Sequence, residues 1–172
     1  AGPEFINFWA WFLFAAACAG VALLTLTAKR RPRLAQLAFL IVAAFILANK
    51  VYSPQFVLWL IPLAALARPR WADFLAWQFF EVLHWWAVWM YLGALTSGGD
   101  ARNNIEAAYY VWAVAGHVLA TAFLMARIVA DILYPEQDPV RRRGVDDPQG
   151  GPFNGVPDRW VLRRGRRADQ VA

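Results

Sequence analysis

A polar segment between two apolar stretches carries the residues best suited to binding an anion. Lys50 supplies a cation there and Ser53 a hydroxyl, and the amide side chains of Asn49 and Gln55 flank them. Pro54 suits the first turn of a helix, where its missing N–H costs nothing. The N–H groups and the positive dipole end of that helix would face Lys50, which predicts a site for a lipid phosphate. The structural alternative is that Lys50 snorkels to the membrane surface and Ser53 caps the helix.

Glu81 and His84 form the second candidate, three residues apart and therefore on one helix face. Ionisable side chains are costly at membrane depth, which makes them functional candidates by default. They are predicted either to contact a donor or acceptor sugar, or to join their helix to helices of a missing N-terminal half of the protein. Glu-x-x-His also occurs in di-metal bundles, but those use a second copy that this sequence lacks, so no metal site is expected. His117, beside Gly116, is interpreted as a hydrogen-bonding residue between closely packed helices.

The composition is that of a membrane protein. Of the 172 residues, 60% are hydrophobic and ten are Trp, and the mean hydropathy is +0.37. A soluble domain of this size is about half apolar. The formal net charge of +5 is concentrated in the loops and the tail, so a nucleic-acid partner is not expected. Cys18 is the only cysteine, which excludes a disulfide framework, and no cofactor is expected.

Five transmembrane helices, in an all-α bundle of residues 1–134, are predicted to position these side chains. About 20 helical residues cross a hydrocarbon core about 30 Å thick. The second and third segments are short and are joined only by residues 49–53, so a re-entrant hairpin is an alternative to two full crossings. The five segments are residues 6–27, 34–48, 54–67, 71–95 and 107–133.

The distribution of basic residues predicts the topology. If all five segments cross, the Lys and Arg residues of the tail and of the loops at 28–33 and 68–70 fall on one side. Only Lys50 and Arg102 fall on the other side. The positive-inside rule then assigns the Arg-rich side to the cytoplasm. The chain is accordingly predicted to be a multi-pass protein of the plasma membrane, surrounded by lipid, with its N-terminus outside.

Residues 135–172 are predicted to form a disordered, basic cytoplasmic tail, since Pro, Gly and charged residues leave little apolar surface to bury. The final arginine cluster, with Trp160, is predicted to solubilise the chain or to dock onto anionic lipid headgroups. Arg127 and Asp131, just before the tail, are predicted to pair with each other or to snorkel. No initiator Met precedes Ala1, and the sequence is interpreted as part of a larger protein.

The string Asn-Lys-Val-x-Ser-Pro-Gln-Phe, followed by Leu-Trp-Leu-x-Pro-Leu, occupies residues 49–63. It resembles a late segment of the multi-pass glycosyltransferases of the GT-C superfamily. The specific resemblance is to the bacterial glycosyltransferase family 87, including its actinobacterial members, and it extends more distantly to the eukaryotic GPI mannosyltransferase I. The resemblance covers most of residues 6–155, and the 49–63 string is its specific part.

The resemblance implies a cell-envelope enzyme that transfers a sugar, often mannose, from a polyprenyl-phosphate donor on the extracytoplasmic side. Lys50 would contact the donor phosphate, with Asn49, Ser53 and Gln55 as hydrogen-bond partners. The family's general base is expected in an outer loop of the N-terminal half, which nothing here matches. The chain is therefore expected to be a C-terminal part that lacks the catalytic acid and packs against N-terminal transmembrane helices of the same protein. A non-enzymatic membrane scaffold is the main alternative, and a transporter with an intramembrane Glu and His proton relay is the third.

Overall fold

The computed structural model describes residues 2–49, 53–97, 105–156 and 158. No strand occurs in these ranges, so the all-α prediction is confirmed. The predicted segments agree with the observed helices to within a few residues, because apolar runs bounded by Pro and charged residues define both. The helices are α1 (Pro3–Thr27), α2 (Leu34–Ala48), α3 (Val57–Ala67), α4 (Trp71–Thr96) and α5 (Ala107–Leu133).

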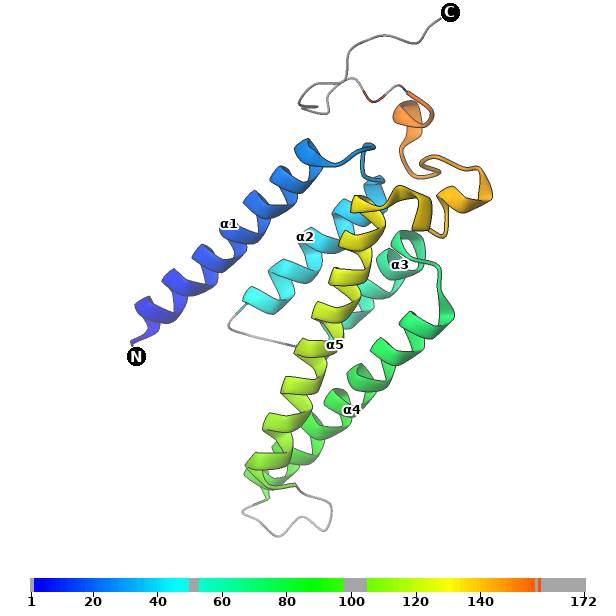
Figure 1. Ribbon diagram of the computed structural model, residues 1–172. Coiled ribbons are helices and arrows are strands. Elements are labelled where there is room, and N and C mark those ends of the chain that lie inside the picture. The colour runs from blue at the N-terminus through cyan, green and yellow to red at the C-terminus, as the bar shows by residue number, and fades with distance from the viewer. Residues whose placement is uncertain (1, 50–52, 98–104, 157, 159–172) are drawn as a thin grey trace, which may run out of the picture.

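The helices run up and down in succession (Figure 1). α2 packs between α1 and α3 and also contacts α5, whereas α4 packs mainly on α5. The buried core lies where α2, α3, α4 and α5 meet, and its largest members include Phe39, Leu40, Leu60, Trp77 and Leu124. α1 contributes no buried residue: the side that packs on α2 is half-buried, and large apolar side chains such as Phe8, Trp11 and Leu23 are exposed elsewhere on it. This exterior suits an apolar environment and not water.

Within the described residues, two helices are long and apolar enough to cross a membrane: α1 with 25 residues and α5 with 27. α2 has 15 residues, a rise of about 22 Å at 1.5 Å per residue. A 3-10 turn, η1 (Pro54–Phe56), leads into α3, and the two together are about as long as α2. α2 and α3 therefore form a short hairpin beside the longer helices (Figure 1).

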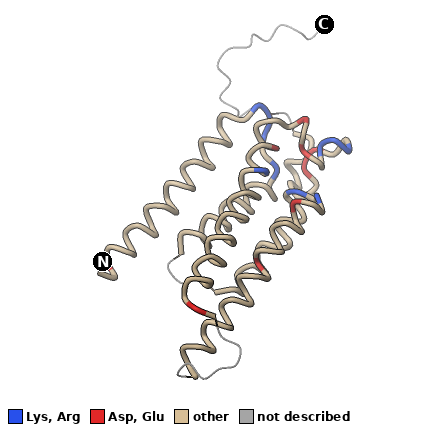
Figure 2. Tube along the Cα trace, turned by 60° about the horizontal axis from the view of Figure 1, so that its bottom comes forward, with Lys and Arg blue, Asp and Glu red and all other residues tan. Residues whose placement is uncertain are grey.

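Figure 2 shows that the Lys and Arg residues of the described chain gather at one end of the bundle. This is the end at which α1 and α3 finish and α2 and α4 begin. The clustering follows from the order of the helices, because every second connection lies at this end. Asn49 and Ser53, which flank the connection from α2 to α3, lie toward the opposite end.

Residues 135–156 are folded over the basic end, so the prediction of a disordered tail is wrong for this part. Asp138 is fully buried and accepts hydrogen bonds from Arg33 Nε at 2.7 Å, Arg33 Nη2 at 3.0 Å and Gln36 at 3.2 Å. Arg33 is equally buried and also donates to the Leu66 carbonyl at 3.0 Å. Buried polar contacts, and not an apolar core, fix this segment on the helices. Composition alone does not reveal such contacts. Its three short turns are η2 (Pro135–Gln137), η3 (Arg141–Arg143) and η4 (Gly151–Phe153).

Asp146 makes a second connection between the tail and the loop after α1. Its carboxylate lies 3.1 Å from Arg30 Nη2 and 3.2 Å from the Nη2 atoms of Arg31 and Arg141. Burial alone would raise the pKa of Asp146, but a hydrogen bond from the Gly155 N–H and the three guanidinium charges hold this pKa below its ordinary value. Asp146 therefore stays ionised, and the connection intact, throughout the neutral pH range.

Arg68 joins three elements at the same end. Its Nε lies 2.6 Å from Asp73 of α4, and its Nη1 bonds Asp131 of α5. The Nε atom of Arg127 lies 3.9 Å from Oδ2 of the same Asp73. The predicted pairing of Arg127 with Asp131 is thus wrong, because the fold places the end of α3 beside the end of α5 and gives each residue a partner from another element.

Candidate functional site

The structure describes only part of the predicted phosphate site, because Lys50 lies outside the described residues. Asn49 is the C-cap of α2, and Ser53 is the N-cap of η1. Pro54 occupies the first turn of the helical run, as predicted, and Gln55 beside it is exposed. The Ser53 side chain makes no capping hydrogen bond, so the capping part of the structural alternative is wrong, whereas the predicted snorkelling of Lys50 falls outside the described residues. The described polar side chains of this site therefore gather around a single turn of the short hairpin.

A cavity of about 340 Å³ opens beside Asn49, between α1 and α2. Its walls are mainly aromatic, with Trp11 and Phe14 from α1 and Phe45 from α2. The Phe14 and Phe45 rings meet edge to face, 5.7 Å apart. Asn7 and Asn49 are its polar lining residues. Such a cavity suits an apolar chain that carries a polar group at one end.

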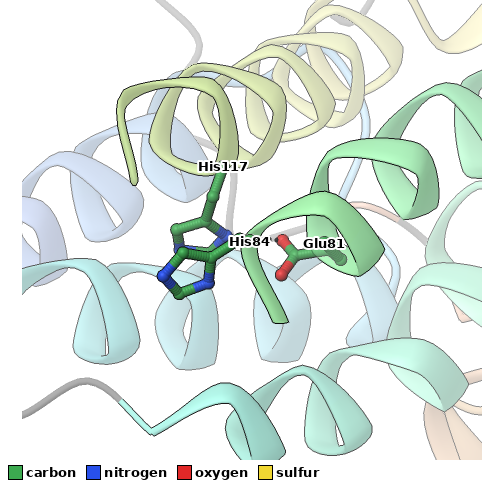
Figure 3. A group of neighbouring side chains, drawn as sticks. All are labelled: Glu81, His84 and His117. Carbon is green, nitrogen blue, oxygen red and sulfur yellow. Dashed lines mark hydrogen bonds and ion pairs between the residues drawn. The ribbon is translucent and has the colours of Figure 1, made fainter. Parts of the chain in front are cut away.

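Glu81 and His84 of α4 meet His117 of α5 in the middle of the two long helices (Figure 3). All three side chains are buried. His117 Nδ1 lies 2.8 Å from Glu81 Oε1, and the Thr121 hydroxyl donates to the same oxygen at 3.1 Å. The indole N–H of Trp77 in turn donates to the Thr121 hydroxyl at 3.2 Å. Of the two predicted roles for Glu81 and His84, the structure shows a contact between helices, but the predicted partner is wrong: α4 contacts α5 of this chain and not a helix of the missing half.

A column of rings continues this polar array along the interface between α4 and α5. The His84 and His117 rings stack with centroids 4.9 Å apart and planes inclined by 21°. His84 also stacks on Tyr110 at 6.4 Å, and Tyr110 lies nearly parallel to Tyr91 at 4.7 Å. The rings come alternately from the two helices. The interface is therefore specified by directional contacts and not by apolar packing alone.

Gly116 allows the two helices to approach closely beside His117. A Cβ atom at this position would lie 2.9 Å from Cδ1 of Phe80 on α4, a separation that side chains do not tolerate without a shift. The small residue therefore permits the hydrogen bond between Glu81 and His117. The prediction that Gly116 marks close helix packing is confirmed.

One carboxylate and two imidazoles are also the ligand types of transition-metal sites. Ligand atoms of Glu81, His84 and His117 lie within 4.8 Å of one another. A bound metal has its ligands at about 2 Å, so the three atoms would have to close in by small rotations. Glu-x-x-His was visible in the sequence, but its third member was not. His117 lies 36 positions after Glu81, and only the pairing of α4 with α5 brings the two together.

In comparisons with protein families, curated proteins and solved structures, no match to this chain was found. The fold and the site themselves define the class: an all-α bundle with an apolar exterior, a basic end and a buried polar array between its two longest adjacent helices.

Proposed function

We propose that this chain is the C-terminal membrane portion of a glycosyltransferase that transfers a sugar, mannose by the resemblance of residues 49–63, from a polyprenyl-phosphate donor to an extracytoplasmic acceptor. One observation carries the proposal. Asn49 and Ser53, the described residues that flank the connection from α2 to α3, lie away from the basic end, and Asn49 lines an aromatic cavity that suits an isoprenoid chain. A donor phosphate and its lipid would thus find adjacent polar and apolar surroundings.

The proposed setting is the plasma membrane, with the basic end in the cytoplasm and the N-terminus outside. The gathering of Lys and Arg at one end supports this orientation through the positive-inside rule. Exposed large apolar side chains along α1 and α4 support contact with lipid or with further helices of the same protein. α4 has 26 residues, which is also long enough to cross.

The length of the hairpin α2–α3 supports the re-entrant alternative. Starting at the cytoplasmic interface near Arg33, α2 rises about 22 Å, whereas the hydrocarbon core is about 30 Å thick. The turn at 49–53 would then lie within the outer half of the bilayer, at the bottom of a recess beside the longer α1. A recess of this kind lets a lipid-borne donor present its phosphate to the turn from the side.

The chemistry of the turn fits a phosphate leaving group. A fixed cation stabilises negative charge that develops on phosphate as the bond to the sugar breaks. Lys50 would supply that charge, and Asn49, Ser53 and Gln55 would supply hydrogen bonds. The general base would come from the N-terminal half, so residues 1–172 contribute to donor binding and not to activation of the acceptor.

The test is Lys50→Ala in the full-length enzyme, assayed for donor-dependent sugar transfer on monodisperse purified protein. Loss of a charge-assisted bond to phosphate should lower turnover by about tenfold to hundredfold. Lys50→Arg should keep part of the activity, since the charge remains while its geometry changes. Ser53→Ala should cost about fivefold, as a neutral hydroxyl bond contributes about 1 kcal/mol.

Arg102→Ala is the matched control, because Arg102 is the other cation predicted on the outer side. It should leave turnover unchanged. Wild-type turnover in well-folded Lys50→Ala would remove the phosphate role of this residue. A full-length protein with no donor-dependent transfer at all would instead favour the scaffold alternative.

A further inference from the structure

A basic pocket of about 330 Å³ lies at the cytoplasmic end as proposed above, between the start of α4 and the folded tail. Arg68 and Arg70 line it from the connection between α3 and α4, and Arg143 lines it from η3 of the tail. Trp71 and Phe74, on the first turn of α4, form its aromatic wall, with their rings edge to face at 6.0 Å. Three elements thus contribute to one pocket.

The pocket carries an excess of positive charge. Arg68 is neutralised, since it pairs with both Asp73 and Asp131. Neither Arg70 nor Arg143 forms an ion pair within the described part of the chain. Arg70 and Arg143 therefore face one pocket from different elements, and the three arginines that line it outnumber the two carboxylates beside it, of which Asp131 also acts on Arg70 through its charge. Guanidinium groups bind phosphate through paired hydrogen bonds, so the complementary ligand is a phosphate group.

An exposed apolar stripe extends from this pocket along α4. Trp71, Leu75, Phe79 and Val82 follow one another at intervals of four, four and three residues, so they share one helix face. Their exposed fractions are 76%, 57%, 64% and 62%. A cationic pocket at one end of an apolar stripe matches the shape of a phospholipid, with its headgroup above its acyl chains.

We propose that this pocket binds the headgroup phosphate of an anionic phospholipid of the cytoplasmic leaflet, with the acyl chains lying along the stripe on α4. Arg70 and Arg143 hold the phosphate, and Trp71 lies at the level of the interface, where its amphipathic ring is favoured. Because Arg143 belongs to the tail, the bound lipid also connects the tail to α4. The inference rests on the membrane setting proposed above but not on the glycosyltransferase activity.

The experiment is native mass spectrometry of the full chain in detergent, titrated with phosphatidylglycerol or with phosphatidylcholine. We expect one molecule of phosphatidylglycerol to bind with an affinity at least about tenfold higher than that of phosphatidylcholine. Arg70→Gln with Arg143→Gln should abolish this preference, while Arg70→Lys with Arg143→Lys should retain most of it. Neither arginine supports an ion pair in the described chain, so the variants should fold. Arg142→Gln is the matched control, since it removes the same charge from the same 3-10 turn outside the pocket.

Two outcomes would overturn the proposal. The first is an equal preference in wild type and in the double Gln variant, because the two arginines would then not hold the phosphate, or an equal loss in Arg142→Gln, because binding would then follow net charge alone. The second is displacement of the lipid by millimolar glycerol phosphate or inorganic phosphate, which would identify a site for a soluble phosphate. Donor-dependent transfer by the full-length enzyme is a separate readout, so failure here is distinguishable from failure of the proposed function.

Discussion

At the scale of single residues, Glu81 is the point at which the polar contacts between α4 and α5 meet. One of its oxygens accepts from Thr121 and lies 2.8 Å from His117, and Thr121 in turn accepts from Trp77. A carboxylate buried between helices is tolerated only where such partners surround it. This array is the internal counterpart of the ion pairs of Arg33 and Arg68 at the basic end.

Glu81→Ala should therefore destabilise the bundle by about 1–3 kcal/mol, because it leaves the buried hydroxyl and imidazole groups around it without their acceptor. Glu81→Gln keeps an acceptor oxygen and should cost less than half as much. Reversible unfolding in mixed detergent micelles measures both. Glu106→Ala removes an exposed carboxylate at the start of α5 and serves as the control. An Ala variant as stable as wild type would mean that the array contributes nothing to packing.

At the scale of the elements, the fit between α4 and α5 depends on a glycine at one position and not at another. Gly116 faces Phe80, whereas Gly93 of α4 has open space around it. The two positions form a matched pair, since both lie inside long helices.

Gly116→Ala should destabilise the protein by about 1–3 kcal/mol through overpacking against Phe80. Gly93→Ala should be neutral or stabilising by up to about 1 kcal/mol, because alanine favours helix and nothing there obstructs its methyl group. Combining Gly116→Ala with Phe80→Leu should recover part of the loss. Melting temperatures in detergent are sufficient as a readout. A Gly116→Ala protein as stable as Gly93→Ala would contradict the close approach.

The hairpin α2–α3 sets the depth of the proposed phosphate site. In a Cys18→Ala background, Asp100→Cys should react in intact cells with impermeant maleimides, and Arg142→Cys should not. Ser53→Cys should react with a small impermeant reagent but not with a bulky one, because the proposed re-entrant hairpin would place this residue in a recess. Equal reaction of positions 53 and 100 with both reagents would indicate two full crossings. Protection of position 100 together with labelling of position 142 would show that the orientation is the reverse of the proposed one.

At the scale of the whole molecule, the segment after α5 returns to the start of the chain and fastens the basic end. Asp138 lies 105 positions after Arg33, and Asp146 contacts three arginines from both regions. These contacts connect the tail to the loop after α1, and Arg33 also connects them to the end of α3. The tail is therefore part of the fold as far as residue 156.

Asp138→Asn should cost about 3–5 kcal/mol, because it leaves the buried Arg33 charge without compensation. Glu136→Gln, two positions away and exposed, should cost nothing measurable. Replacing both partners, as Arg33→Met with Asp138→Leu, should cost less than Asp138→Asn alone, since no buried charge remains. Unfolding in detergent measures the loss of stability, and the protease sensitivity of residues 139–156 measures release of the tail. A stable Asp138→Asn tail would show that other contacts suffice.

The sequence alone determined the positions of the helices and the side of the bundle that is basic. Both are local properties, because apolar runs of about helix length, Pro54 at a helix start and arginines beside the ends of segments act within a few residues of themselves. The polar turn at 49–55 was likewise visible as a string. The nearness of Asn49 to Trp11 and Phe14 was not, since it depends on how α1 packs on α2.

Only the tertiary structure decided which charged and polar groups meet. Glu81 pairs with His117 across 36 positions, Arg68 with Asp131 across 63, and Arg33 with Asp138 across 105. A buried charge needs some partner, but that requirement does not specify which of several carboxylates will serve. The choice follows from helix order and crossing, which place distant residues within hydrogen-bond range. For the same reason residues 135–156 are ordered despite their small apolar surface, because Asp138 and Asp146 complete ion pairs with arginines beside the helix ends.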